Sequence, residues 1–166
     1  MTRTFDLEPS KPLAPDHAVA ALIHTSDGLY LLQRRDRKRT IFYPDHWGCF
    51  GGAMEPGEAP EDALRRELRE ELRLSLEGSQ FKLFGHFRFA VEPAEIAALD
   101  RFYYDVLIEP TAVDRLQPGE GAAMEMADGS EALHERCLVP YDAFALWLHY
   151  YQHMLIGRRQ GGPGCR

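Results

Sequence analysis

The sequence lacks the features that mark secreted, disulfide-stabilised or membrane proteins. Its three cysteines, Cys49, Cys137 and Cys165, are odd in number and widely spaced, which indicates neither a disulfide framework nor a cysteine-bound zinc site. No apolar run approaches the roughly eighteen residues that a membrane span requires. The first residues, Met-Thr-Arg-Thr-Phe-Asp, lack the apolar stretch of a signal peptide. We therefore expect a cytoplasmic protein with no membrane partner.

Lysine and net positive charge are also scarce. Only three of the nineteen basic residues are lysine, and the formal net charge is −7. A protein that binds nucleic-acid polymers needs a basic surface, so this balance argues against such a partner. It leaves room for a small phosphate substrate if metal ions neutralise the site. The arginines suit bidentate contacts with phosphates or carboxylates.

The length of 166 residues favours one domain with a real hydrophobic core. An apolar content of 45% and a charged content of 27% are ordinary for a soluble globular protein. Residues 1–16 contain three prolines and are expected to form an extended arm. We assign residues 17–157 to the domain and 158–166 to a flexible C-terminal tail.

The first part of the domain has the pattern of strands joined by turns. A buried strand is expected over 17–24 and a hairpin partner over 29–35, with Ser26-Asp27-Gly28 as the turn. A loop and a short strand at 47–50 then lead into a glycine-rich segment. Further on, apolar residues alternate over 81–89, which predicts a half-buried strand.

The second part combines strands and helices. Residues 93–99 favour a short helix or loop, and strands are expected over 101–108 and 124–127. Ser130 is expected to cap a short helix, and a longer helix should run from Pro140 to about residue 156, with Gly157 as its terminator. One stripe of this helix is expected to form core or a homodimer surface: Phe144, Trp147, Leu148, Tyr151 and Leu155.

The most informative segment runs from Gly52 to Leu74. It contains Glu67, Glu70 and Glu71, which share one helix face because they are three and four residues apart. Like charges this close repel each other, and Mg²⁺ would remove the conflict because it prefers oxygen ligands. The alternative is an exposed helix whose arginines form ion pairs with these acids. That alternative explains neither the glycines nor Glu58.

Helix geometry supports a division of faces in this segment. Leu64, Leu68 and Leu72 form one stripe that should pack on a sheet. Pro60 suits the first helical position. Upstream, Gly51 and Gly52 lack a Cβ, so their backbone can approach a metal or phosphate closely.

The segment resembles the signature of the Nudix hydrolases, Gly-x5-Glu-x7-Arg-Glu-(apolar)-x-Glu-Glu-x-Gly-(apolar). The matching residues are Gly52, Glu58, Arg66, Glu67, Leu68, Glu70, Glu71 and Leu74. Arg73 stands where the family has glycine. Since that glycine normally ends the helix, we expect the helix to run further and stop before Gly78.

The resemblance implies an α/β fold, a Nudix-type α/β/α sandwich with a mixed sheet. It also implies Mg²⁺-dependent hydrolysis of a pyrophosphate bond in a nucleoside diphosphate linked to another group, as in a nucleotide sugar or a nucleoside triphosphate. Mn²⁺ can substitute in such enzymes. The ADP-ribose type usually has a proline about sixteen residues past the signature glycine. Phe89 occupies that position, which weakens this substrate class.

The resemblance also implies roles for individual residues. The metal ligands would be the Gly52 carbonyl, Glu67, Glu70 and Glu71. One of the glutamates would also accept a proton from water, and Glu70 and Glu71 are the catalytic candidates. Glu58 and Arg66 would brace the loop.

Three residues outside the signature are further candidates. Arg34 and Arg35 end a strand that faces the glycine loop, so they are candidates for phosphate contacts. Glu120 resembles a catalytic glutamate that some triphosphate-cleaving Nudix enzymes carry six positions ahead of a tryptophan, although Met126 replaces the tryptophan here. A loop carboxylate can close on a bound substrate, and the alternative for Glu120 is a solvated loop acid.

Two alternatives from other functional classes are kept. A Nudix-fold binding or regulatory module without turnover is one, although such modules often lose signature carboxylates and this chain has them all. An isomerase of the isopentenyl diphosphate type is the other, since it uses a cysteine and a glutamate. Cys49 lies near the glycine loop, but inside an expected strand it is better interpreted as a small buried hydrophobe.

Overall fold

The computed structural model describes residues 17–38, 41–89, 99–119 and 123–161. The expected arm at 1–16, most of the expected helix or loop at 93–99, and Glu120 lie outside these residues.

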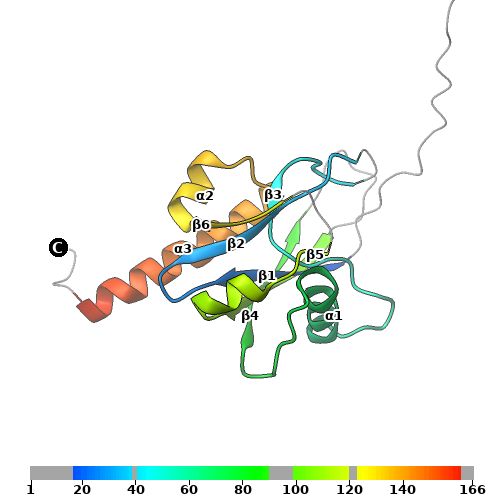
Figure 1. Cartoon of the computed structure of the whole chain (residues 1–166), viewed down its shortest axis with the longest axis horizontal. Helices are drawn as coiled ribbons and strands as arrows, with labels where there is room; N and C mark the ends of the chain where they lie inside the picture. The colour runs from blue at the N-terminus through cyan, green and yellow to red at the C-terminus, as the bar shows by residue number, and fades with distance from the viewer. Residues whose placement is uncertain (1–16, 39–40, 90–98, 120–122, 162–166) are drawn as a thin grey trace, which may run out of the picture.

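A six-stranded mixed sheet forms the centre of the molecule (Figure 1). Its strands are β1 (Ala18–His24), β2 (Leu29–Arg34), β3 (Trp47–Gly48), β4 (Phe81–Phe89), β5 (Leu99–Leu107) and β6 (Ala123–Asp128). They follow the order β3-β2-β1-β5-β4, and β6 pairs with β2. The central pair β1–β5 is parallel, whereas the other pairs are antiparallel. The α/β architecture with a mixed sheet is the one expected.

Helices cover both faces of this sheet (Figure 1). The helical segments are α1 (Pro60–Leu72), a 3-10 helix (Pro110–Arg115), α2 (Gly129–Glu135) and α3 (Pro140–Gly161). Successive side chains of β1 point to opposite faces, because a strand has a period of two. Val19, Ala21 and Ile23 therefore pack in the cluster with the leucines of α1, and Ala20 and Leu22 pack in the cluster with Ala145 and Leu146 of α3.

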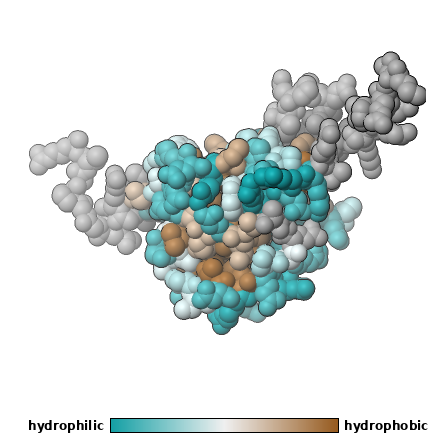
Figure 2. Space-filling view, turned by 45° about the horizontal axis from the view of Figure 1, so that its top comes forward, coloured by the Kyte–Doolittle hydropathy of each residue, from teal (hydrophilic) through white to brown (hydrophobic). Residues whose placement is uncertain are grey.

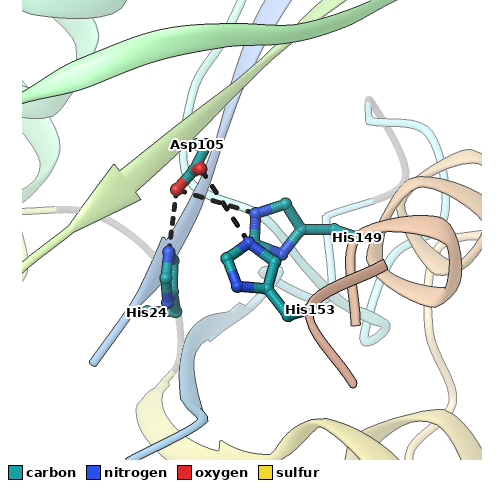
Figure 3. Close-up of side chains that lie close together, drawn as sticks. All are labelled: His24, Asp105, His149 and His153. Atoms are coloured by element: carbon teal, nitrogen blue, oxygen red, sulfur yellow. Dashed lines mark hydrogen bonds and ion pairs between the residues drawn. The ribbon is translucent and has the colours of Figure 1, made fainter. Parts of the chain in front are cut away.

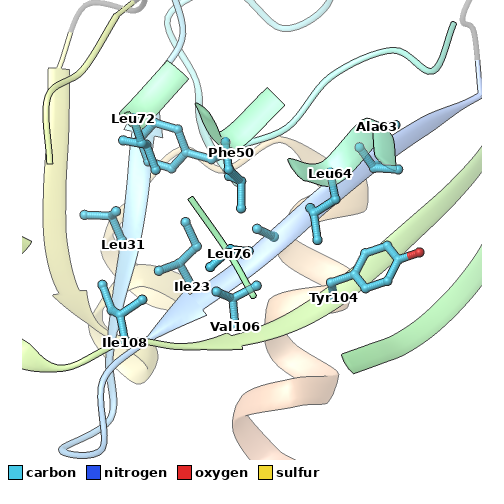
Figure 4. Packing of buried hydrophobic residues seen from close by; sticks show 13 residues of the cluster. Ile23, Leu31, Phe50, Ala63, Leu64, Leu72, Leu76, Tyr104, Val106 and Ile108 are labelled. Carbon is cyan, nitrogen blue, oxygen red and sulfur yellow. The ribbon is translucent and has the colours of Figure 1, made fainter. Parts of the chain in front are cut away.

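The leucine stripe of α1 is buried, as its periodicity predicts. Leu64, Leu68 and Leu72 are each 0% exposed and pack against β1, β2 and β5 (Figure 4). Burying a side chain of this size contributes about 1.5–3 kcal/mol. This packing fixes the rotation of α1, and the rotation decides where its glutamates point.

The end of α1 differs from the expectation. The helix ends at Leu72 instead of continuing toward Gly78, and Arg73 adopts the left-handed conformation with φ 57°. The Arg73 amide donates to the Arg69 carbonyl, and the Leu74 amide donates to the Leu68 carbonyl. Arg73 therefore takes the conformation of the family's glycine and bears the steric cost of its Cβ.

A bulge changes the expected alternation in β4. The register with β5 shifts between Leu83 and Gly85, and Leu83 is 53% exposed. Beyond the shift, Phe87 and Phe89 pack in the cluster on the α3 face, whereas Phe81, which precedes the shift, packs in the cluster on the α1 face. An extra residue in one strand reverses which side chains face which side, and sequence alternation alone does not reveal it.

Two expected helix boundaries are wrong. The side chain of Asp128, not Ser130, caps α2, because its carboxylate accepts hydrogen bonds from the Ser130 and Glu131 amides. Helix α3 continues through Gly157 to Gly161. A glycine inside a helix costs only about 1 kcal/mol, so it does not have to end one.

The aromatic stripe of α3 does not belong to the core. Phe144, Trp147 and Tyr151 are 43%, 49% and 41% exposed. The buried side of α3 is formed by Asp142, Ala145, Leu146 and His149. The homodimer surface expected on this stripe stays a prediction.

Most of the surface seen in Figure 2 is polar, as expected when apolar side chains are buried. The face in Figure 2 is largely hydrophilic, with an apolar area near its middle. Among the residues that the structure describes, no helix has the length and apolar character needed to cross a membrane.

Candidate functional site

The glycine loop lies along β1. The Val19 amide donates to the Gly52 carbonyl at 3.0 Å, and the Ala21 amide donates to the Phe50 carbonyl at 2.8 Å. Gly51 has φ 131°, and a Cβ there would lie 2.3 Å from the Val19 carbonyl oxygen. The loop can approach the strand this closely only because this position is glycine.

Gly52 sits directly against the signature helix. A Cβ on Gly52 would lie 2.6 Å from the carboxylate of Glu67, so any other residue there would have to displace that carboxylate. The Gly52 carbonyl accepts one hydrogen bond from Val19, and its oxygen retains a second lone pair. The loop and the helix thus gather oxygen donors in one small space.

The three signature glutamates differ in exposure. The side chain of Glu70 is 63% exposed, that of Glu67 is 14% exposed, and Glu71 is partly buried. Burial raises the pKa of Glu71 to about 7. The Gly51 amide opposes this rise because it donates to the Glu71 carboxylate at 2.8 Å, whereas the negative charge of Glu67 adds to the rise. Burial likewise raises the pKa of Glu67 against the opposing effect of Arg66.

These shifts have a common physical meaning. Buried carboxylates close together resist carrying negative charge unless a cation compensates them. The donors around Gly52 are all oxygens, which is the ligand set of Mg²⁺. The residues present therefore fit a divalent cation.

Arg66 ties the glycine loop to α1. Its guanidinium donates to both carboxylate oxygens of Glu58, at 2.9 and 2.8 Å, to Glu67 at 2.6 Å and to the Ala53 carbonyl at 3.0 Å. Hydrogen bonds from Arg66, followed by one from the Glu55 amide, lower the pKa of Glu58 to about 2. The planar fork of arginine suits this set of acceptors, which lysine could not satisfy together.

The two arginines at the end of β2 behave differently. Arg34 pairs with Asp45 at 2.8 Å, and its Nε is buried without a hydrogen-bond partner among the described residues. Arg35 donates from Nε to the Phe42 carbonyl at 3.0 Å, and its positive charge opposes the rise in the pKa of Glu71. Of the pair, Arg35 is thus in electrostatic reach of the signature carboxylates.

Gln33 is a residue of this site that the sequence did not single out. It is buried, its Nε2 donates to the Cys49 carbonyl at 3.1 Å, and its side-chain amide opposes the rise in the pKa of Glu71. Gln33 thereby connects the chain that leads into the glycine loop with the carboxylate of Glu71. The sequence feature that could have identified Gln33 is its side-chain amide, which directly follows the apolar residues Leu-Tyr-Leu-Leu of the same strand.

The segment before Glu120 is attached to the end of α1. The Gly119 amide donates to the Glu71 carbonyl at 2.7 Å, and the Gln117 amide donates to the Leu72 carbonyl at 3.2 Å. A Cβ on Gly119 would lie 2.7 Å from the Glu70 carbonyl oxygen. The chain is therefore fixed beside the signature helix up to the residue that precedes Glu120.

Cys49 belongs to the opposite face of the sheet. Its side chain is 5% exposed and packs in the cluster on the α3 face, while its amide donates to the carboxylate of Asp142 at 3.0 Å. Burial raises the pKa of its thiol well above the ordinary value. A protonated, enclosed thiol is a poor acid–base or nucleophilic group, which argues against the isomerase alternative.

The chain resembles known proteins in sequence and in fold. The family model of the NUDIX domain matches residues 14–153. A nucleoside triphosphatase NudI from Enterobacter sp. (strain 638) is 52% identical over 52 residues, which are 31% of this chain and 36% of that protein. The chain therefore matches only about a third of the length of this curated relative.

Solved structures share the fold over most of the chain. A MutT protein from Methanosarcina mazei Go1 has a TM-score of 0.67 at 18% identity, covering 87% of this chain and 99% of that one. The E. coli dihydroneopterin triphosphate pyrophosphohydrolase has a TM-score of 0.65 at 16% identity, covering 84% and 99%. Together with the family match over residues 14–153, these likenesses lead to one conclusion: the chain belongs to the Nudix family.

Proposed function

We propose that this protein is a Mg²⁺-dependent hydrolase of a pyrophosphate bond in a nucleoside diphosphate linked to another moiety. The observation that carries the proposal is the group of glutamates around Gly52, two of which have a pKa raised by burial. A site that concentrates unfavourable negative charge beside a glycine loop is suited to a cation and its phosphate ligand.

The substrate class that we favour is a nucleoside triphosphate, with a nucleotide sugar as the second member of the class. A nucleoside triphosphatase and a triphosphate pyrophosphohydrolase occur among the similar proteins, which supports this choice. The partner would be a small nucleotide in the cytoplasm, with neither a nucleic-acid polymer nor a membrane involved.

The cation would be held by the Gly52 carbonyl, Glu67, Glu70 and Glu71. When bound, Mg²⁺ or Mn²⁺ would offset the charge of the phosphates and acidify a water molecule. Members of the Nudix family generally use divalent metals, and the all-oxygen donor set here suits one.

The chain's own groups would do the remaining work. Glu70 or Glu71 would accept the proton of the attacking water, since an ionised carboxylate can act as a general base. Arg66 and Glu58 would keep the glycine loop rigid, and Arg35 would contact a phosphate, with Arg34 as a further candidate. Glu120 would approach from its loop once the substrate is bound.

The alternative is a Nudix-fold module that binds a nucleotide without hydrolysing it. The retention of all three signature glutamates favours turnover, because binding alone does not need a proton acceptor.

A substrate panel tests the proposal. Nucleoside triphosphates, nucleotide sugars and ADP-ribose would be incubated with the protein and Mg²⁺ or Mn²⁺, and the products identified by chromatography. We expect metal-dependent release of a nucleoside monophosphate and a phosphate-bearing product. Glu70→Gln should reduce turnover by about 100-fold or more, whereas Glu61→Gln, an exposed acid on the first turn of the same helix, should not. Tight nucleotide binding without any product would favour the regulatory module instead.

A further inference from the structure

A second cluster of potential metal ligands lies outside the signature site. It consists of His24, Asp105, His149 and His153, whose side chains point toward one another in Figure 3. His24 ends β1, Asp105 lies on the adjacent strand β5, and the other two histidines lie on successive turns of α3. This cluster is on the α3 face of the sheet, whereas the signature glutamates belong to α1 on the other face.

The distances suit a single ion. His24 Nε2 lies 2.8 Å from Asp105 Oδ1, His149 Nε2 lies 3.6 Å from the same oxygen, and His153 Nε2 lies 3.9 Å from Oδ2. One ligand atom from each of the four residues lies within 4.8 Å of the others. Tetrahedral zinc with bonds of about 2.0–2.1 Å separates its ligands by about 3.3 Å. Small side-chain adjustments would complete that geometry.

His149 supplies a second, independent observation. Its side chain is 0% exposed, yet its Nε2 has no hydrogen-bond partner in the described part of the chain. A buried polar atom without a partner is costly and requires an explanation. The nitrogen points into the cluster in Figure 3, so a metal ion there would satisfy it.

The outer contacts orient the rings as metal ligands require. His149 Nδ1 lies 2.8 Å from the Tyr30 hydroxyl, and His24 Nδ1 lies 3.3 Å from the Thr25 carbonyl. In metal sites a ligating histidine donates its second N–H to such an oxygen, which leaves Nε2 free to bind.

The charges are also suitable. Lys82 pairs with Asp105 Oδ2 at 3.0 Å, the oxygen nearest His153, which leaves Oδ1 to face His24 and His149. The side chain of His153 is 47% exposed and provides a route for an ion into an otherwise buried cluster.

We propose that His24, Asp105, His149 and His153 bind one Zn²⁺ per chain. Three imidazoles and one carboxylate match the ligand chemistry of zinc, and four protein ligands describe a closed structural site rather than a catalytic one. The ion would join the middle of α3 to β1 and β5. This zinc site does not depend on the nucleotide hydrolysis proposed for the signature site.

Zinc titration of the full-length chain tests this proposal. The protein would be produced without a histidine tag, stripped with a chelator and titrated with Zn²⁺ in an excess of Mg²⁺, which occupies the signature carboxylates. We expect one Zn²⁺ per chain and a rise in melting temperature of about 5–10 °C at saturating metal. Co²⁺ should give the visible absorption of a tetrahedral site.

Variants assign the ion to the cluster. His153→Gln changes a partly exposed side chain, so the fold should persist while zinc affinity falls at least tenfold. His134→Gln, at an exposed histidine on α2, is the matched control and should bind as the wild type does. His149→Gln should abolish binding, with circular dichroism checking its fold.

Two further results would decide the matter. Zinc binding that persists in Glu67→Gln and Glu71→Gln would keep the new site separate from the signature site, whatever the substrate proves to be. No binding in Mg²⁺ excess, or equal affinity in His153→Gln and the wild type, would overturn the proposal and leave the cluster as a network of buried ion pairs.

Discussion

Replacing Glu71 by glutamine should abolish hydrolysis and stabilise the metal-free protein at the same time. Burial raises the pKa of this carboxyl from 4.5 to about 7, so ionising it in the folded state is unfavourable. Between these two values the folded state binds more protons than the unfolded state, so stability falls as pH rises. The full shift in pKa corresponds to a loss of about 3 kcal/mol in the free energy of unfolding, and this loss is complete above pH 7.

Glutamine is neutral at every pH and can still accept the Gly51 amide bond. We therefore expect Glu71→Gln to be about 2 kcal/mol more stable than the wild type at pH 8, which is about 4–8 °C in melting temperature. The gain should vanish at or below about pH 4.5, where both side chains are neutral.

Urea denaturation in the presence of a chelator measures this gain at both pH values. Glu61→Gln, at an exposed acid on the same helix, serves as the control and should change little. If Glu71→Gln were no more stable than the wild type at pH 8, the carboxyl would not be strained and the reasoning would fail. Saturating Mg²⁺ should reduce or reverse the difference, because the ion stabilises only the ionised wild-type site.

Four other outcomes are expected. Turnover should rise from neutral to mildly alkaline pH, since a water bound to Mg²⁺ is less acidified than one bound to zinc; a flat profile with chemistry rate-limiting would contradict this. Glu120→Gln should lower kcat more than it raises KM with little change in melting temperature, and an unaltered kcat would make Glu120 a solvated loop acid. Arg73→Gly should stabilise the protein by about 1 kcal/mol in urea denaturation, because its φ of 57° suits glycine; a loss of stability would refute that account. Trp147→Glu should shift any homodimer toward monomer in sedimentation, as the exposed aromatic stripe would lose its apolar centre, and a monomeric wild type would exclude the dimer.

The sequence was most informative where local pattern decides structure. Pro60 begins α1, and the stripe Leu64, Leu68 and Leu72 faces the sheet, because helix periodicity and the spacing of apolar residues suffice to predict both. The signature glutamates lie near the glycine loop for the same reason, since the orientation of α1 follows from its leucines. The family match then agrees with the fold expected from the order of elements.

The features that escaped prediction depend on contacts distant in sequence. Arg73 ends its helix because the Leu74 amide bonds back to the Leu68 carbonyl and Leu76 joins the core, which no propensity of arginine indicates. The rings of Phe144 and Trp147 look like core residues, but the buried side of α3 is chosen by its fit to the sheet. The histidine cluster needs the parallel pairing of β1 with β5 to bring His24 beside Asp105, 81 positions later, and the packing of α3 to add His149 and His153.

Asp142 gives α3 a mechanical connection to the signature loop. Its carboxylate accepts the Cys49 amide and the Tyr103 hydroxyl, and a Cβ on Gly48 would lie 2.6 Å from it. The His149 contact follows two turns later, about 10 Å along the helix. A rotation of α3 about its axis would therefore displace Cys49 and the glycine loop that follows it. Any ligand or second subunit that moves the exposed side of α3 would alter the geometry of the signature site from the opposite face of the sheet.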